Sequence, residues 1–222
     1  ASKVSRPWYM VNKYKEPGQV VSFITQLFDS HLQDKLGFDL LKDVQLLTPQ
    51  HKGPLGTKEL NILLQRLIQK KLYNFDCPPV AADKRPPFYA GDKVIQTRNN
   101  YDLDVMNGAI GTILEADSKI LKIQFDDETV EIDRNSDDLN DISLAYALTI
   151  HKYQGSEIPC AIVIMHYSHQ FMLSRNLFYT AVTRARQTAI IVGNSAGIKK
   201  AAANVQIDKR NTFLSLMQKQ KG

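Results

Sequence analysis

The chain has 222 residues, of which 43% are hydrophobic and 23% charged, a composition typical of a globular protein with one or two domains. No apolar run approaches the ~20 residues that span a bilayer, and the first residues lack a signal pattern, so we expect a soluble protein. Cys77 and Cys160 belong to no CxxC or Cys/His cluster, which disfavours a disulfide framework or zinc site and favours a reducing, cytoplasmic location.

The net charge of +5 is only a weak indication of a polyanionic partner, but its distribution is uneven. Residues 84–142 hold 7 basic and 13 acidic side chains, a net charge of −6, which leaves +11 for the remainder of the chain. The middle of the chain therefore differs in character from its flanks.

The first part of the chain predicts an α/β layer. An apolar stripe at helical spacing follows Pro17 and stops at Gly37, and a short apolar run at residues 44–47 predicts a buried strand. After a glycine- and proline-containing loop, regularly spaced leucines predict a second helix that begins near Thr57.

Residues 77–88 contain four prolines and no periodicity, which is typical of an extended linker. Short apolar runs separated by turn signals follow, and they predict strands at residues 93–97, 109–114, 121–125 and 129–132. This spacing favours a small, strongly bent sheet or barrel of the SH3 kind.

The α/β pattern resumes after Asp141, with a strand at residues 161–165, a helix at about 175–186 and a strand at 189–192. These strands are almost continuously apolar, as in a parallel sheet covered on both faces. The predicted organisation is one discontinuous α/β domain, residues 1–87 and 142–222, interrupted by a β-rich module at residues 88–141.

Two segments contain side chains suited to chemistry. Residues 147–157 form a polar turn with a glycine, which is either an ordinary exposed turn or a place where backbone approaches a ligand. Residues 176–186 predict an amphipathic helix with Arg184 off its apolar arc. Such an arginine is either solvated or salt-bridged, or it presents its planar fork to a phosphate.

Taken in order, Thr-Ile-His-Lys-x-Gln-Gly-Ser-Glu from residue 149 and Asn-Leu-x-Tyr-Thr-Ala-x-Thr-Arg-Ala from residue 176 resemble motifs V and VI of superfamily 1 helicases. The stretches at residues 45–57 and 91–108 resemble the RecD-like branch, that of the exodeoxyribonuclease V alpha subunit. The resemblance covers roughly residues 40–195. It implies a RecA-like, P-loop NTPase-type parallel sheet domain interrupted by an SH3-like β-barrel insertion.

The resemblance also implies roles for individual residues. Arg184 matches the arginine finger, the catalytic residue that stabilises charge on the γ-phosphate of ATP, while Gly155 and Glu157 match positions that touch the bound nucleotide. Four residues would contact single-stranded DNA through phosphates and stacking, namely Thr48, His51, Thr149 and His151.

The same resemblance implies an ATP-dependent 5′-to-3′ DNA helicase that uses ATP and Mg²⁺, both bound mainly by an N-terminal P-loop half that this chain lacks. No GxxxxGK[ST] motif occurs in the 222 residues, so we expect the chain alone to be inactive as an ATPase. The implied partners are single-stranded DNA, the protein's own N-terminal RecA-like domain and possible subunits of a repair complex, with no membrane. No resident metal is expected, because His166 and His169 lack a supporting carboxylate or cysteine.

One other interpretation stays open at this point, and two more are not favoured. A run at residues 122–128 imitates a Walker B strand but lies inside the β-rich module, so we interpret it as a hairpin. The acidic module is also compatible with a non-catalytic nucleic-acid- or protein-binding module that has a RecA-like fold. A nuclease is not favoured, because no carboxylate cluster has metal-binding spacing.

Overall fold

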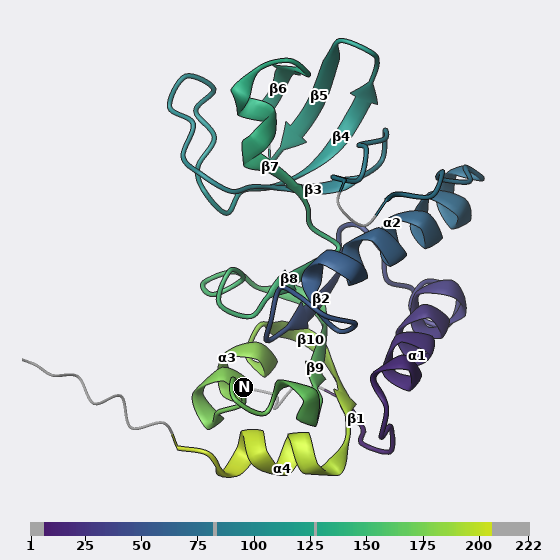
Figure 1. Cartoon of the computed structure of the whole chain (residues 1–222), viewed down its shortest axis with the longest axis vertical. Coiled ribbons are helices and arrows are strands. Elements are labelled where there is room, and N and C mark those ends of the chain that lie inside the picture. The colour runs from purple at the N-terminus through teal and green to yellow at the C-terminus, as the bar shows by residue number, and fades with distance from the viewer. Residues whose placement is uncertain (1–6, 82–83, 127, 206–222) are drawn as a thin grey trace, which may run out of the picture.

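The computed structural model describes residues 7–81, 84–126 and 128–205 (Figure 1). Within these residues two five-stranded sheets are present. One is parallel with strand order β1-β10-β9-β2-β8, and the other is antiparallel with strand order β6-β5-β4-β3-β7. The predicted fold class is confirmed, because a parallel α/β sheet is interrupted by a small β module.

The parallel sheet is covered by helices on both faces. Its strands are β1 (Trp8–Val11), β2 (Val44–Thr48), β8 (Ala147–Thr149), β9 (Ile158–Met165) and β10 (Ala185–Gly193). On β9, Ile162 and Ile164 pack with α1 (Pro17–Ser30) and α2 (Thr57–Tyr73), whereas Val163 and Met165 pack on the side of α3 (Arg175–Val182) and α4 (Ser195–Ala203). The near-continuous apolar runs of the central strands follow from this double coverage.

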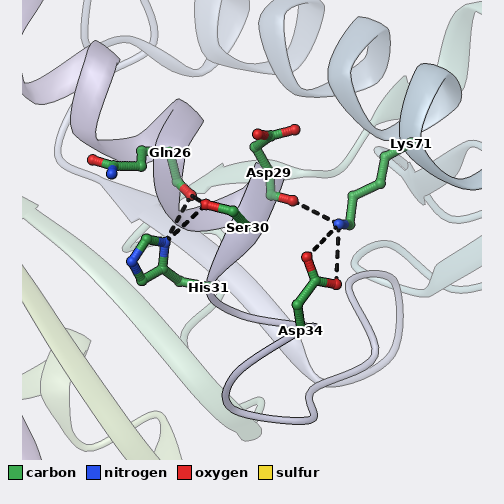
Figure 2. A network of polar contacts seen from close by, with 6 residues as sticks. All are labelled: Gln26, Asp29, Ser30, His31, Asp34 and Lys71. Atoms are coloured by element: carbon green, nitrogen blue, oxygen red, sulfur yellow. Dashed lines mark hydrogen bonds and ion pairs between the residues drawn. The ribbon is translucent and has the colours of Figure 1, made fainter.

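A polar network ties the end of α1 to α2 (Figure 2). The Nζ atom of Lys71 donates to the backbone oxygen of Asp29 at 2.6 Å and to both carboxylate oxygens of Asp34 at 3.0 and 3.2 Å. Nearby, His31 Nδ1 lies 3.0 Å from Ser30 Oγ and 3.2 Å from the Gln26 carbonyl oxygen at the helix end. The side chain of Lys71 is largely buried, so α1 and α2 are held together by more than their apolar contacts.

The antiparallel sheet contains β3 (Lys93–Gln96), β4 (Ile110–Ala116), β5 (Ile120–Phe125), β6 (Glu128–Asp133) and β7 (Ile142–Leu144), with a 3₁₀ turn η1 (Asp137–Asp141) before β7. Strands β5 and β6 pair directly from Ile120–Asp133 to Phe125–Glu128. The interpretation of residues 122–128 as a hairpin is therefore confirmed.

Two adjacent buried residues fasten the antiparallel sheet to the parallel one. The carboxylate of Asp92 accepts hydrogen bonds from Gln65 and Gln69 on α2, at 2.6 and 2.9 Å, and from the Tyr146 hydroxyl before β8, at 2.9 Å. Lys93 donates from Nζ to the Val44 carbonyl oxygen at 3.0 Å, and burial lowers the pKa of this amine to about 8. These hydrogen bonds therefore fix the position of the antiparallel sheet relative to the parallel sheet.

Several boundaries differ from those expected. The helix expected over residues 175–186 ends at Val182, because β9 captures the chain there, with Ile158 N donating to the Arg184 carbonyl oxygen at 2.9 Å. Strand β10 accordingly begins at Ala185 instead of residue 189, and β1, β8 and α4 were not expected. Strand β7 belongs to the antiparallel sheet and runs to Leu144, beyond the expected boundary at 141/142. The division into domains at 87/88 and 141/142 stays a prediction.

Candidate functional site

The loops that follow β2 and β8 meet at the carboxyl edge of the parallel sheet. Thr48 and Thr149 end these strands as register partners. Thr48 is fully buried, and its hydroxyl donates to the Leu55 carbonyl oxygen at 2.6 Å, which folds the following loop back onto the strand. The DNA contact expected from the Thr48 side chain does not fit this arrangement, because the hydroxyl is enclosed and already bonded.

A pocket of about 310 Å³ opens beside Thr149, where the parallel sheet, α2, the proline-rich linker and the antiparallel sheet meet. We call it the junction pocket. It is lined by His51, Thr57, Lys58, Asn61, Arg85, Pro86, Phe88, Ile95, Thr97, Ser143, Leu144, Ala147, Leu148, Thr149 and Lys152. Two of the four expected DNA-contact residues, His51 and Thr149, are thus brought to one place. His51 is oriented by Thr57, with Nδ1 and Oγ1 2.5 Å apart.

The junction pocket is positively charged. Lys58, Arg85 and Lys152 line it, and no acidic residue does so within the described part of the chain. Lys152 donates from Nζ to Asn107 Oδ1 at 2.9 Å, while Arg85 lies over the Phe88 ring with its guanidinium carbon 4.8 Å from the ring centroid. Burial lowers the pKa of both Lys152 and Arg85, which shows that each charge is partly withdrawn from water.

A single segment, residues 150–157, leads from this edge of the sheet to the opposite one. Leu47 pairs with both Leu148 and Val163, so β8 ends level with the carboxyl end of β9, and the chain must return along the sheet to start β9 at Ile158. It does so on the α3 and α4 side, where Ile150 and Tyr153 are buried. The return ends at Gly155, whose φ of +97° is a conformation that favours glycine.

Arg184 lies where this returning segment meets the start of β10. Its Nε donates to the Thr180 carbonyl oxygen and its Nη1 to the Ser156 carbonyl oxygen, each at 3.0 Å. Ser156 stands between Gly155 and Glu157, both of which are exposed. The three residues assigned to nucleotide binding are therefore neighbours at the amino edge of the sheet, with a half-buried guanidinium held by backbone carbonyls.

Comparison with known proteins identifies the family of the chain. The chain matches the family model described as "UvrD-like helicase C-terminal domain" over residues 144–192 and that of the "ATP-dependent RecD-like DNA helicase SH3 domain" over residues 60–131. It is 40% identical over 171 residues to the ATP-dependent RecD2 DNA helicase of Deinococcus radiodurans, covering 77% of this chain and 23% of that protein. The chain belongs to the RecD-like helicases.

Another relative is the RecBCD enzyme subunit RecD of Mycobacterium tuberculosis, 32% identical over 163 residues, covering 73% of this chain and 27% of that protein. The chain thus spans about a quarter of the length of these relatives. Among solved structures, the Pif1 helicase from Bacteroides in complex with ADP-AlF3 and ssDNA is 15% identical, with a TM-score of 0.49, covering 95% of this chain and 54% of that chain.

His151 of this RecD-like chain lies apart from the other expected DNA contacts. It is exposed and lines a second pocket of about 250 Å³ beside the start of α3, together with Gln154, Ser174, Asn176 and Thr180. The expected DNA-contact set is thus divided among the protein interior, the junction pocket and this second pocket.

Sequence reasoning missed Lys58, Arg85 and Lys152. A signal existed for Lys152, which stands inside the motif V stretch, and for Lys58, which directly follows another matched stretch. Arg85 lies in the linker, where no periodicity indicates which way a side chain points. Only the fold of the RecD-like chain brings these three cations together.

Within residues 7–81, 84–126 and 128–205, no three His, Cys, Asp or Glu side chains are grouped so as to hold a metal ion. No helix in this part of the RecD-like chain is long and apolar enough to cross a membrane. Cys77 and Cys160 are both buried free thiols.

Proposed function

We propose that this chain is the second motor domain of an ATP-dependent 5′-to-3′ DNA helicase, in which Arg184 acts as the arginine finger. The observation that carries the proposal is the contact of Arg184 with Ser156, which places a guanidinium beside Gly155 and Glu157 at one edge of the sheet. The site is completed by a P-loop domain outside these 222 residues, which contain no GxxxxGK[ST] motif.

The surroundings of Arg184 fit a phosphate group. Two of its hydrogen bonds go to neutral carbonyl oxygens, at Thr180 and Ser156, and a third goes to the Thr183 hydroxyl at 3.2 Å. A phosphate oxygen would replace a neutral acceptor with a charged one, and charge-assisted bonds are roughly twice as strong. If Arg184 kept its hydrogen bond to Thr180 and released the one to Ser156, its guanidinium could turn toward the nucleotide while β10 stayed in place.

ATP supplies the transferable phosphoryl group when it is bound, and Mg²⁺ neutralises charge on that group. The exposed Glu157 carboxylate and the Gly155 backbone would contact the nucleotide from this chain. As the resemblance to RecD-like helicases implies, we assign the ligands of Mg²⁺ mainly to the P-loop domain. We therefore expect no measurable ATP hydrolysis by the 222-residue chain alone, and robust DNA-stimulated turnover by that chain would contradict this division of labour.

Single-stranded DNA would lie along the carboxyl edge of the sheet, at the junction pocket. Lys58, Arg85 and Lys152 provide charge for phosphates, and His51 and Thr149 provide polar contacts. Segment 150–157 runs from this carboxyl edge to the amino edge, where the nucleotide would bind. DNA and ATP would therefore contact opposite ends of one stretch of backbone.

The decisive experiment compares the full-length protein with its Arg184→Ala and Arg184→Lys variants in DNA-stimulated ATPase and unwinding assays. We expect turnover to fall by about 10³-fold or more in both variants, because a lysine lacks the planar fork, while DNA affinity stays within about twofold. Arg66→Ala, an exposed arginine on α2, is the matched control. Near-normal turnover of folded Arg184→Ala protein would refute the arginine-finger role.

A non-catalytic binding module is the second candidate, and the net charge of −6 between residues 84 and 142 favours it, because that charge repels phosphates. The same assays decide between the two. A full-length protein that binds a partner but shows no DNA-stimulated ATP hydrolysis would establish the binding module.

A further inference from the structure

The junction pocket combines two kinds of surface that a phosphate-binding groove alone does not need. Its floor is apolar and deeply buried, with Phe88, Ile95, Leu144, Ala147 and Leu148 each at most 6% exposed. Its rim is cationic and polar. A groove that only tracks a phosphate backbone requires the charges of the rim, because phosphates gain nothing from an apolar floor.

The charge of the pocket also stands out against its surroundings. The antiparallel sheet that forms one wall belongs to a stretch with 13 acidic residues, yet none of those that the structure describes lines the pocket. The wall instead presents Ile95, Thr97, Ser143 and Leu144. An anionic ligand with an apolar part is therefore complementary to this site.

We propose that the junction pocket receives one base of single-stranded DNA, while Lys58, Arg85 and Lys152 hold the adjoining phosphates. This inference rests on the proposed function, which places DNA at this edge of the sheet but requires no base to enter the protein. The volume of about 310 Å³ lies at the small end of ligand sites, which span roughly 300–1,000 Å³, and so suits a single planar group.

The polar groups around the pocket indicate little discrimination between bases. The amide of Asn61 is fully engaged with the backbone of Ala147, donating at 2.9 Å and accepting at 2.8 Å. The Lys152 ammonium is held against Asn107. The lining also includes the Thr97 and Ser143 hydroxyls, which can meet a base edge, and a hydroxyl both donates and accepts. The pocket is thus built for sequence-tolerant burial of a base.

The test measures the full-length protein by fluorescence anisotropy with two labelled strands of equal length, an oligothymidylate and a fully abasic deoxyribose-phosphate strand. The wild-type chain is compared with Ser143→Phe, which fills the pocket from β7, and with Thr97→Phe, which fills it from the end of β3. Ser22→Phe on the exposed face of α1 is the matched control. Circular dichroism verifies that each variant is folded.

We expect the wild-type chain and the control to bind the abasic strand about five- to a hundredfold more weakly than the oligothymidylate, the range for one buried base. The filled variants should bind the abasic strand as the wild type does, within about twofold, and lose at least fivefold of the preference for bases. An undiminished preference for bases in folded Ser143→Phe and Thr97→Phe would overturn the base pocket alone. Failure of the wild type to bind either strand would overturn the proposed function as well.

Discussion

Asn61 holds the free edge of β8 in place. Strand β8 is the last strand of the parallel sheet, and Ala147 at its start is completely buried. The Asn61 side chain bonds both the carbonyl oxygen and the N–H of Ala147, at 2.9 and 2.8 Å, and so completes the hydrogen bonding that an edge strand lacks. We expect Asn61→Ala to lower the free energy of unfolding by about 3 kcal/mol, because two buried backbone groups lose their partners at about 1–3 kcal/mol each and water from the junction pocket offsets part of the loss.

Urea denaturation followed by circular dichroism measures this loss, with Asn140→Ala, an exposed asparagine in η1, as the control that should change the free energy by less than about 0.5 kcal/mol. Asn61→Asp sharpens the test. At neutral pH the new carboxylate can accept from the Ala147 N–H but repels the carbonyl oxygen, and acid restores a donor by protonating it. The deficit of Asn61→Asp relative to the wild type should therefore shrink as the pH falls. If Asn61→Ala lowered the free energy of unfolding by less than about 1 kcal/mol, Asn61 would not hold the edge of β8 in the way described.

Two further predictions concern the stability of the parallel α/β domain. Burial, and to a lesser degree His166, lower the pKa of His169 from 6.5 to about 4, so the folded state keeps this ring neutral while the unfolded chain takes up a proton below pH 6.5. As the pH falls from 6.5 to 4, the wild type should lose up to about 3 kcal/mol that His169→Leu does not lose in matched pH-dependent denaturation, and identical profiles would contradict this. Gly193→Ala should destabilise by about 1–3 kcal/mol, because a Cβ atom there would overlap the Met165 carbonyl oxygen, whereas Gly18→Ala, with nothing within 4 Å, should be neutral or slightly stabilising in thermal melts.

The sequence predicts the elements whose periodicity is long and whose ends carry a backbone signal. The start of α2 at Thr57 and the hairpin of β5 and β6 are confirmed. The end of α3 was placed four residues too late, since the sequence around Thr183 continues a helical pattern and only the pairing of Arg184 with Ile158 stops it. Strand β8 was missed because its three residues are too short to show a period.

Sequence reasoning can group site residues that lie in one segment or in consecutive motifs. It cannot group residues that come from several distant segments. Gly155 and Glu157 share one motif with Ser156, the hydrogen-bond partner of Arg184 from the next motif, so the sequence order already predicts that these residues are neighbours. The junction pocket joins residues as distant as His51 and Lys152 through the register of β2 and β8, which no local pattern encodes. Thr48 shows what the sequence does not encode, because a strand-ending threonine looks the same in sequence whether its hydroxyl faces a ligand or, as here, a backbone carbonyl.

One hydrophobic core runs without interruption from Ile24 and Leu64 on the helices to Ile123 and Val130 in the antiparallel sheet. The insertion is therefore continuous with the α/β domain in packing, although the proline-rich linker separates them in sequence. Cutting the chain at residues 87 and 141 would divide this core and expose apolar surface on both pieces, because the two parts share one hydrophobic cluster. Any rotation of the insertion relative to the parallel sheet would have to disrupt this shared core and the hydrogen bonds of the buried residues Asp92 and Lys93.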